Sequence, residues 1–221
     1  MYEQIIFVTG IGTDVGKTVV SAVLARALEA DYWKPVQAGF DQGTDSQWVA
    51  GLLGEKRGTL HPEVYRLALP ASPHIAARQE GIRLSVQEIV GAFRRLRPGS
   101  SRLVVEGAGG LLVPLNDREF VADLAAALAT RVVLVSRHYL GSINHSLLTA
   151  AVCRQKSLPV GGWIFNDQAA GLEDYQEDIV SWSGYPKLGA VPRLDQIDSE
   201  TVARIASLLQ PGLASLIHES C

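Results

Sequence analysis

Short runs of apolar residues alternate along the chain with longer segments in which apolar residues recur at helical spacing. The short runs are continuously apolar, which is typical of strands that are buried on both faces of a sheet. The longer segments present one apolar side, which predicts amphipathic helices. We therefore expect strands at Gln4–Thr9, Tyr32–Val36, Leu103–Val105, Val132–Val135, Val160–Phe165 and Leu188–Val191, and helices at Thr18–Ala30, Ser85–Leu96, Phe120–Ala129, Ile143–Arg154, Asp174–Trp182 and Ser199–Leu209.

This order of elements predicts the α/β fold class, with a mainly parallel sheet covered by helices on both faces. We expect one domain that spans residues 1–221. Ligands of such folds bind at the carboxyl ends of the strands, so a polar motif that directly follows a strand is a candidate for function. The segment Phe40–Ile75 has the least regular pattern, and we expect it to hold a lid or a substrate loop.

The glycine-rich segment Gly10–Thr18 joins the first predicted strand to the first predicted helix. Its last residues are Gly-Lys-Thr, and this position between strand and helix is the context of a phosphate-binding P-loop. Lys17 can neutralise charge on the β- and γ-phosphates of ATP, and the Thr18 hydroxyl can ligate Mg²⁺. Backbone N–H groups at the helix N-terminus can bind phosphate oxygens. The residues expected to contact the nucleotide here are Thr13, Asp14, Val15, Gly16, Lys17, Thr18 and Val19.

The spacing of this loop differs from the usual P-loop pattern, whose first glycine would fall at Ile11 rather than at Gly10. The difference indicates a subclass of P-loop NTPase fold. The alternative is a glycine-rich turn with a chance Gly-Lys-Thr. The agreement of strand, turn, lysine, hydroxyl and helix favours the P-loop.

Two charged residues stand at the ends of other predicted strands. Lys34 lies beside the second strand; a lysine there is usually a solvated surface residue, but next to the P-loop its amine could reach the γ-phosphate. Glu106 follows Leu103–Val105 and precedes four small residues, Gly107, Ala108, Gly109 and Gly110. This arrangement is typical of a Walker-B-type carboxylate beside a metal ion, and the glycines favour it over a merely exposed charge.

The local sequence does not decide between a structural and a functional role at two further places. Asp45 lies in Gly43-Thr44-Asp45-Ser46, and its spacing alone favours a helix-cap region. Asn166 and Asp167 follow the fifth predicted strand. The carboxamide of Asn166 could pair with the edge of a base, but an Asn-Asp turn is equally consistent with the local sequence.

Composition narrows the classes of function. The chain has 221 residues, is 47% hydrophobic and 19% charged, and has a formal net charge of −3, which gives no case for a nucleic-acid or membrane partner. Its cysteines, Cys153 and Cys221, predict neither a disulfide nor a cysteine metal site. No apolar run reaches membrane-spanning length and no charged leader precedes Ile5–Val8, so we expect a cytoplasmic protein.

Taken together, these motifs resemble the dethiobiotin synthetase family. The matching segments appear in family order, cover nearly the whole chain and are highly specific in combination. They are Val8–Gly10, Gly16–Thr18, Lys34–Val36, Thr44-Asp45, Ser72–His74, Val105–Gly110, Gly141–His145 and Trp163–Asp167. The gap between Gly10 and Gly16 is the family's own variant of the P-loop.

The resemblance implies a reaction of biotin biosynthesis, in which 7,8-diaminononanoate, CO₂ and ATP give dethiobiotin, ADP and phosphate. CO₂ forms a carbamate with one amine, ATP phosphorylates the carbamate, and the second amine closes a cyclic urea. Anionic carbamate must meet anionic γ-phosphate, so positive charge must surround both. The resemblance assigns this role to Lys17 and Lys34 as catalytic residues, with Mg²⁺ held by Thr18, Asp45 and Glu106.

The resemblance also implies the remaining contacts. Asn166 is implied to read adenine. The implied contacts to the nucleotide further include Asp167, Gly107, Ala108, Gly109, Pro192, Arg193 and Leu194. The family works as a homodimer, in which Gly141, Ser142, Ile143 and Asn144 of the partner hold the substrate carboxylate at a helix N-terminus. Two positions depart from the family: Gly12 replaces an aspartate, and Ala38 replaces a hydroxyl residue that contacts substrate.

Two rival functions share the predicted fold. An amidotransferase-type cofactor synthase would usually carry a glutaminase domain, for which this chain is too short. A partitioning or metal-cluster-loading ATPase switch would often carry a signature lysine early in the loop, where this chain has Gly12. Such a switch would also bind DNA or a membrane, and the mild acidity gives that no support.

Overall fold

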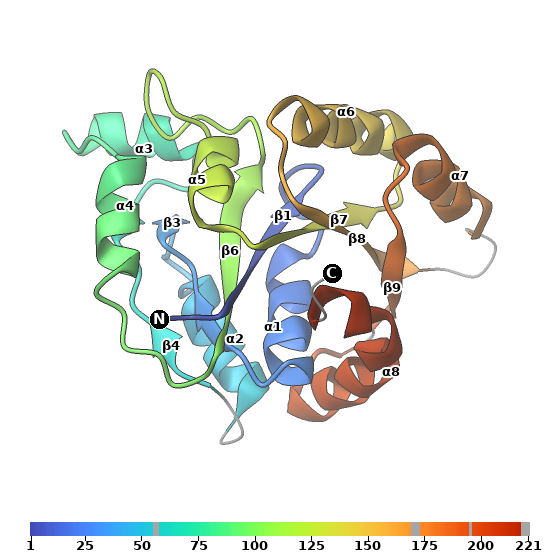
Figure 1. The fold of residues 1–221 in the computed structure, drawn as a ribbon. Helices are drawn as coiled ribbons and strands as arrows, with labels where there is room; N and C mark the ends of the chain where they lie inside the picture. The colour runs from blue at the N-terminus through green and yellow to red at the C-terminus, as the bar shows by residue number, and fades with distance from the viewer. Residues whose placement is uncertain (55–57, 169–172, 195, 218–221) are drawn as a thin grey trace.

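The computed structural model describes residues 1–54, 58–168, 173–194 and 196–217 (Figure 1). Within them, a seven-stranded sheet has the order β4-β2-β6-β1-β7-β8-β9, and every neighbouring pair is parallel. The predicted mainly parallel sheet is therefore confirmed. The bounds of the strands are β4 (Leu60–His61), β2 (Asp31–Trp33), β6 (Arg102–Gly110), β1 (Gln4–Gly10), β7 (Arg131–Arg137), β8 (Val160–Gln168) and β9 (Lys187–Pro192).

Helices cover both faces of the sheet (Figure 1). One face packs against α1 (Lys17–Ala27), α2 (Asp45–Leu53) and α8 (Ser199–Ile217). The other packs against α3 (Pro73–Gln79), α4 (Val86–Phe93), α5 (Val121–Leu128), α6 (Ser142–Gln155) and α7 (Glu173–Ser183). Successive strand residues alternate between the two apolar clusters: Ile6 belongs to the first and Phe7 to the second. The strands are therefore buried on both faces, as their continuous apolar runs predict.

The predicted strand Tyr32–Val36 is wrong, because the chain forms two strands there. β2 ends at Trp33, and β3 (Val36–Ala38) pairs with β5 (Tyr65–Leu67) in a separate two-stranded sheet. Pro35 lies between them; it has no N–H for a ladder, and its ring restricts the backbone of Lys34. The chain therefore leaves the main sheet at Lys34.

The expectation that Phe40–Ile75 holds a lid or a substrate loop stays a prediction. The segment is nevertheless more regular than its sequence pattern indicates. It contains α2, β4, β5 and the start of α3. A capping box begins α2: the Thr44 hydroxyl accepts from the Gln47 N–H, and the Gln47 side chain accepts from the Thr44 N–H. The strands here have only two or three residues, which is too short for a periodic signal.

Three elements extend beyond their predicted ends. β6 continues to Gly110 and β8 to Gln168, so Glu106 and Asn166 lie inside strands, where they pair in register with Val8 and Arg137. α8 runs through Pro211 to Ile217 rather than ending at Leu209. Burial of apolar side chains in this last part of α8, Leu213 and Leu216, stabilises the helix across the proline. Elsewhere the ends differ by a few residues; α1, for example, ends at Ala27 rather than Ala30.

Two expectations about individual features can also be compared with the structure. Cys153 is a free, buried residue of α6, as predicted, whereas Cys221 lies outside the described residues. None of the described helices combines the length and apolar character that are needed to span a bilayer.

α8 packs closely against β9 at Gly212, and this contact allows a prediction about stability. A Cβ atom at Gly212 would lie 1.9 Å from the Leu188 carbonyl oxygen, whereas a Cβ at Gly51 of α2 would meet nothing within 4 Å. We expect Gly212→Ala to lower the free energy of unfolding by about 1–3 kcal/mol through overpacking. The control Gly51→Ala should raise it by about 0.5–1 kcal/mol. Urea unfolding of both variants checks this, and equal stability of the two would contradict it.

Candidate nucleotide and metal site

A cavity of about 850 Å³ opens at the carboxyl ends of β1, β2 and β6. The P-loop, β3, the start of α2 and the loop before α3 form its walls. The residues singled out from the sequence that line it are Thr13, Asp14, Gly16, Lys17, Thr18, Val19, Lys34, Asp45, Glu106, Ala108 and Gly109. Segments far apart in the sequence thus meet where a parallel sheet binds its ligands.

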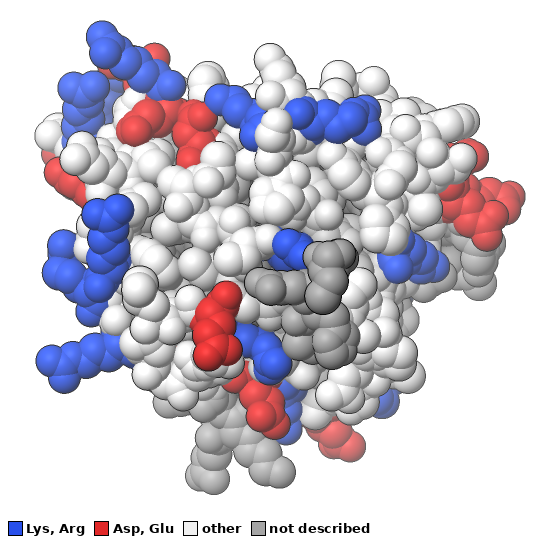
Figure 2. Space-filling model, viewed as in Figure 1, with Lys and Arg blue, Asp and Glu red and all other residues white. Residues whose placement is uncertain are grey.

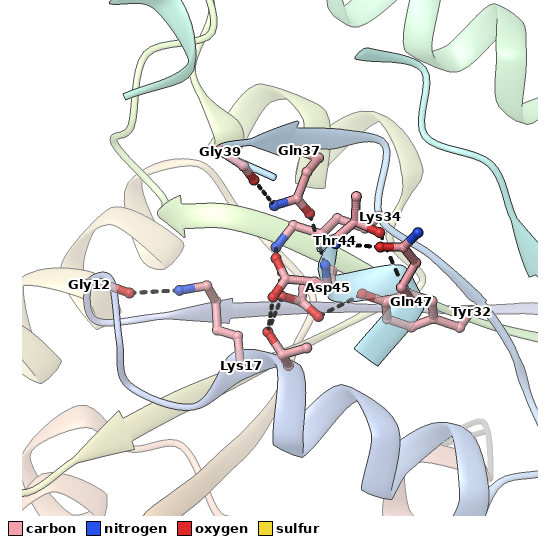
Figure 3. Close-up of polar contacts among 11 residues, drawn as sticks. Gly12, Lys17, Tyr32, Lys34, Gln37, Gly39, Thr44, Asp45 and Gln47 are labelled. Atoms are coloured by element: carbon pink, nitrogen blue, oxygen red, sulfur yellow. Dashed lines mark hydrogen bonds and ion pairs between the residues drawn. The ribbon is translucent and has the colours of Figure 1, made fainter. Parts of the chain in front are cut away.

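Left-handed backbone shapes the P-loop before α1. Gly16 has φ +87°, and a Cβ there would lie 1.9 Å from the Asn166 side-chain nitrogen, so only glycine fits. Asp14 is also left-handed, with φ +57°. The Lys17 ammonium donates to the Gly12 carbonyl at 2.8 Å (Figure 3). Burial lowers the pKa of Lys17 to about 8, against the raising effect of Glu106.

Three side chains with oxygen atoms converge beside the P-loop. The Thr18 hydroxyl lies 3.0 Å from Asp45 Oδ1 and 2.8 Å from Glu106 Oε1. Thr18 comes from α1, Asp45 from the first turn of α2 and Glu106 from β6. The described residues contain no group of three or more His, Cys, Asp or Glu side chains that could hold a metal. Mg²⁺ nevertheless needs only one or two carboxylates beside waters and phosphates, so this set of donors fits Mg²⁺.

Lys34 forms an ion pair with each of the two carboxylates. Its ammonium donates to Glu106 Oε1 at 2.9 Å and to Asp45 Oδ2 (Figure 3), and the residue is only 7% exposed. Burial alone would lower the pKa of Lys34, but Glu106 and Asp45 outweigh it and raise the pKa above its ordinary value. Burial opposes ionisation of Asp45 as well, yet Lys34 holds the pKa of that carboxyl below its usual range. Both groups are therefore charged at neutral pH.

Two polar residues of this site were missed in the sequence. The Tyr32 hydroxyl donates to Glu106 Oε2 at 2.9 Å, and burial together with Glu106 raises the pKa of Tyr32 well above its ordinary value. Gln37 accepts from the Asp45 N–H at 3.2 Å and donates to the Gly39 carbonyl at 2.8 Å. Tyr32 and Lys34 are two positions apart, which would place them on one face of a strand, so a signal existed for Tyr32. No sequence signal pointed to Gln37.

A smaller cleft of about 330 Å³ adjoins the P-loop, because Val19 lines both spaces. Its other lining residues are Arg137, Asn166, Pro192, Arg193, Leu194 and Ile197. Asn166 donates to the Val15 carbonyl at 3.1 Å, and Arg137, which the sequence analysis missed, donates to the Asp14 carbonyl at 3.3 Å. The cleft therefore lies where the nucleoside part of a nucleotide would extend from the phosphate loop.

Some residues singled out in the sequence lie elsewhere. Gly107 is packed against Phe7 inside the sheet and, like Val15, is not among the residues lining either space. Gly141, Ser142, Ile143 and Asn144 form the N-terminus of α6, and in the described part of the chain they line neither space. Ala38 lines the larger cavity without a hydroxyl to offer. The side chain of Asp167 lies outside the described residues.

Comparisons with known proteins identify the family. A family described as an AAA domain matches residues 4–201. The ATP-dependent dethiobiotin synthetase BioD of Cytophaga hutchinsonii is 44% identical over 200 residues, which cover 90% of this chain and 94% of that protein. The proteins of the same name from Rhodopseudomonas palustris and Sphingopyxis alaskensis are 45% and 43% identical, each over 89% of this chain and 91% of the relative.

Solved structures share the fold at much lower identity. The MinC:MinD cell division protein complex of Aquifex aeolicus matches with a TM-score of 0.60 and 14% identity, covering 99% of this chain and 97% of that chain. A ParA family ATPase from Chlorobium tepidum matches with a TM-score of 0.53 and 11% identity, covering 93% and 99%. These likenesses show the P-loop NTPase fold alone. The much closer sequence relatives decide the family: the chain belongs to the dethiobiotin synthetase family.

Proposed function

We propose that this chain is an ATP-dependent dethiobiotin synthetase that forms the cyclic urea of dethiobiotin from 7,8-diaminononanoate, CO₂ and ATP. The observation that supports this proposal most directly is that the Lys34 ammonium binds both Asp45 and Glu106 beside the P-loop. This arrangement concentrates both signs of charge in one cavity. The sequence identity to named dethiobiotin synthetases supplies the substrates.

The reaction brings together two anions, the carbamate of the substrate and the γ-phosphate of ATP. One amine of the substrate adds to CO₂ and loses a proton, which gives a carbamate. A carbamate oxygen attacks the γ-phosphorus of ATP, and ADP leaves. The second amine then attacks the carbonyl carbon of the mixed anhydride, the cyclic urea closes, and phosphate departs with the bonding electrons.

Lys17 and Lys34 overcome the repulsion between carbamate and phosphate. The P-loop residues, from Thr13 to Val19, bind the phosphate oxygens through backbone N–H groups and so orient the γ-phosphorus. Lys17 transfers its hydrogen bond from the Gly12 carbonyl to a phosphate oxygen. Lys34 lies across the cavity, where its ammonium stabilises the charge that develops on the transferred group.

Thr18, Asp45 and Glu106 would hold Mg²⁺, since the Thr18 hydroxyl lies 3.0 Å from Asp45 Oδ1 and 2.8 Å from Glu106 Oε1. Mg²⁺ supplies positive charge that offsets the charge of the β- and γ-phosphates when it is bound. Ala108 and Gly109 line the cavity on the β6 side of this site. The protein's own part is to hold the three ligands in place.

The smaller cleft would receive the nucleoside. Because the Asn166 side-chain nitrogen is bound to the Val15 carbonyl, its carbonyl oxygen is the group left to accept from the exocyclic amine of adenine. Pro192, Arg193 and Leu194, which line the cleft, would complete this nucleotide contact. This order along the sheet, phosphates at the P-loop and base beyond β8, supports ATP as the co-substrate.

A second copy of the chain would complete the substrate site. The Gly141 backbone is left-handed and caps α6. The Ser142 N–H donates to the Tyr139 carbonyl at 2.9 Å, so in the described part of the chain this helix N-terminus presents the N–H groups of Ile143 and Asn144 without a backbone acceptor. Such a helix N-terminus suits the substrate carboxylate. We propose that these residues serve the neighbouring protomer of a homodimer, because they do not line the cavity of their own chain.

A partitioning or metal-cluster-loading ATPase switch is the alternative, and the likeness to MinD and ParA structures is what favours it. That likeness concerns the fold only. On the face drawn in Figure 2, basic and acidic side chains are scattered with broad uncharged areas between them, so this face has no continuous basic surface for DNA. The sequence relatives favour the synthetase.

Phosphate release distinguishes the two functions. With ATP, Mg²⁺ and bicarbonate, we expect release only when 7,8-diaminononanoate is added, and we expect it to stop when CO₂ is removed. The reason is that the phosphate acceptor is a carbamate made from both. A coupled phosphate assay measures it, and turnover that is independent of the diamine would favour the ATPase switch.

Removal of the Lys34 ammonium should abolish most turnover. We expect Lys34→Met to lower kcat by about 10²–10³-fold, the usual loss when one preorganised donor to a transition state is removed. Lys156→Met is the matched control, because Lys156 makes a 2.7 Å ion pair with Asp123 on the surface, away from the cavity. Near-normal turnover of Lys34→Met would discard this role, as would an equal loss in the control.

The Lys34→Met variant also tests, through its pH dependence, the ion pairs that Lys34 makes with Asp45 and Glu106. The pKa of Asp45 is lower in the folded protein than its ordinary value of 3.8. The ionised carboxylate therefore stabilises the fold fully above pH 3.8, and this contribution to the free energy of unfolding is lost as pH falls through the pKa of the folded state. The pKa of Lys34 is raised above its ordinary value of 10.5 in the folded protein. The ammonium group therefore stabilises the fold fully below pH 10.5, and this contribution is lost as pH rises through the pKa of the folded state. The stability lost in Lys34→Met should therefore be full between these limits and shrink in acid. Urea unfolding from pH 3 to 8 measures this; a constant difference would refute it.

A further inference from the structure

Tyr32 and Glu106 are buried partners on adjacent strands. Tyr32 on β2 pairs in register with Val104 on β6, and Glu106 lies two residues further on the same face of β6. Tyr32 is 0% exposed and Glu106 is 1% exposed. Their 2.9 Å hydrogen bond is therefore shielded from water on the side of the carboxylate that faces away from the cavity.

The two oxygens of Glu106 have different partners. Oε1 lies 2.8 Å from the Thr18 hydroxyl and 2.9 Å from the Lys34 ammonium, whereas Oε2 accepts from Tyr32. Because a carboxylate is planar, a partner that fixes Oε2 also fixes the direction of Oε1. The hydroxyl of Tyr32 thus leaves a single oxygen of Glu106 directed at the other proposed metal ligands.

Packing alone does not account for this hydroxyl. Tyr32 belongs to the apolar cluster between the sheet and α1, where a phenylalanine would fill the same space and would bring no polar group that needs a partner. In the described part of the chain, the hydrogen bond recorded for the hydroxyl is the one to Glu106. Its presence is explained by what it does to that carboxylate.

We propose that Tyr32 is a positioning residue that restricts Glu106 to one metal-facing oxygen and thereby selects Mg²⁺ over Ca²⁺. Mg²⁺ demands near-octahedral geometry with single-oxygen ligands, whereas the larger Ca²⁺ accepts carboxylates through both oxygens. A partner behind a ligating carboxylate usually controls metal affinity. The inference rests on the proposed function, because it takes Glu106 as a metal ligand.

Tyr32→Phe is the test, with Mn²⁺ as the spectroscopic probe. In the ADP-bound protein, we expect the dissociation constant for Mn²⁺, measured by electron paramagnetic resonance, to rise 10–100-fold. The Mg²⁺ concentration for half-maximal turnover should rise similarly, while kcat at saturating Mg²⁺ changes little. Competition of Ca²⁺ against Mn²⁺ should weaken less than that of Mg²⁺, because Glu106 is then free to offer both oxygens.

Tyr65→Phe is the matched control. The Tyr65 hydroxyl also donates to a glutamate, Glu88, but neither residue lines the cavity. This variant should bind Mn²⁺ as the wild type does. An equal loss in Tyr65→Phe would overturn the proposal, and so would a Tyr32→Phe variant whose Mn²⁺ affinity and preference between Mg²⁺ and Ca²⁺ are unchanged.

A double variant separates a direct effect from a general loss of stability. If Tyr32 acts through Glu106, Tyr32→Phe should cause no further loss of Mn²⁺ affinity in a Glu106→Gln background. An additive loss would overturn the proposal even if Tyr32→Phe is less stable. Failure of the proposed function has a different signature, since the wild type would then release no phosphate in response to the diamine.

Discussion

A buried ammonium group between two carboxylates holds the carboxyl end of the sheet together. Lys34, which follows β2, binds Asp45 at the start of α2 and Glu106 in β6. Lys34 and Glu106 are almost fully buried, where an isolated charge would be strongly unfavourable, whereas the Asp45 side chain is 32% exposed. The position of α2 relative to the main sheet therefore depends on an electrostatic network as well as on apolar packing.

The same network explains the shape of the chain between β2 and α2. Pro35 ends the pairing of β2 with its neighbours, and the chain turns into the small sheet of β3 and β5. Gln37 in β3 then accepts from the first N–H of α2, and the capping box at Thr44 satisfies further donors. These contacts aim Asp45 at Lys34, so residues of the chain itself hold this part of the site in position.

The likeness to MinD and ParA structures illustrates how little a fold says about chemistry. Those chains match nearly the whole length at TM-scores of 0.60 and 0.53, yet the identities are 14% and 11%. A parallel sheet with a P-loop provides an anion site at the start of α1 in any such protein. The chemistry of this chain therefore has to be argued from the side chains that line the rest of its cavity.

The sequence by itself determined the parallel sheet, the helices on both faces and the P-loop, because each of these is encoded by neighbouring residues: continuous apolar runs, helical periodicity, and a Gly-Lys-Thr between them. The family followed from the order of short motifs. The role of Asp45 stayed open on local grounds, since its partners Thr18 and Lys34 are distant in sequence and only the packing of α2 beside the P-loop brings them near. Asn166 stayed open for the same reason, because its contact with Val15 exists only where β8 lies beside the P-loop. Gln37 and Arg137 became visible only in the tertiary structure, and so did the hydrogen bond of Tyr32 to Glu106, because the tertiary structure alone decides which side chains meet across strands.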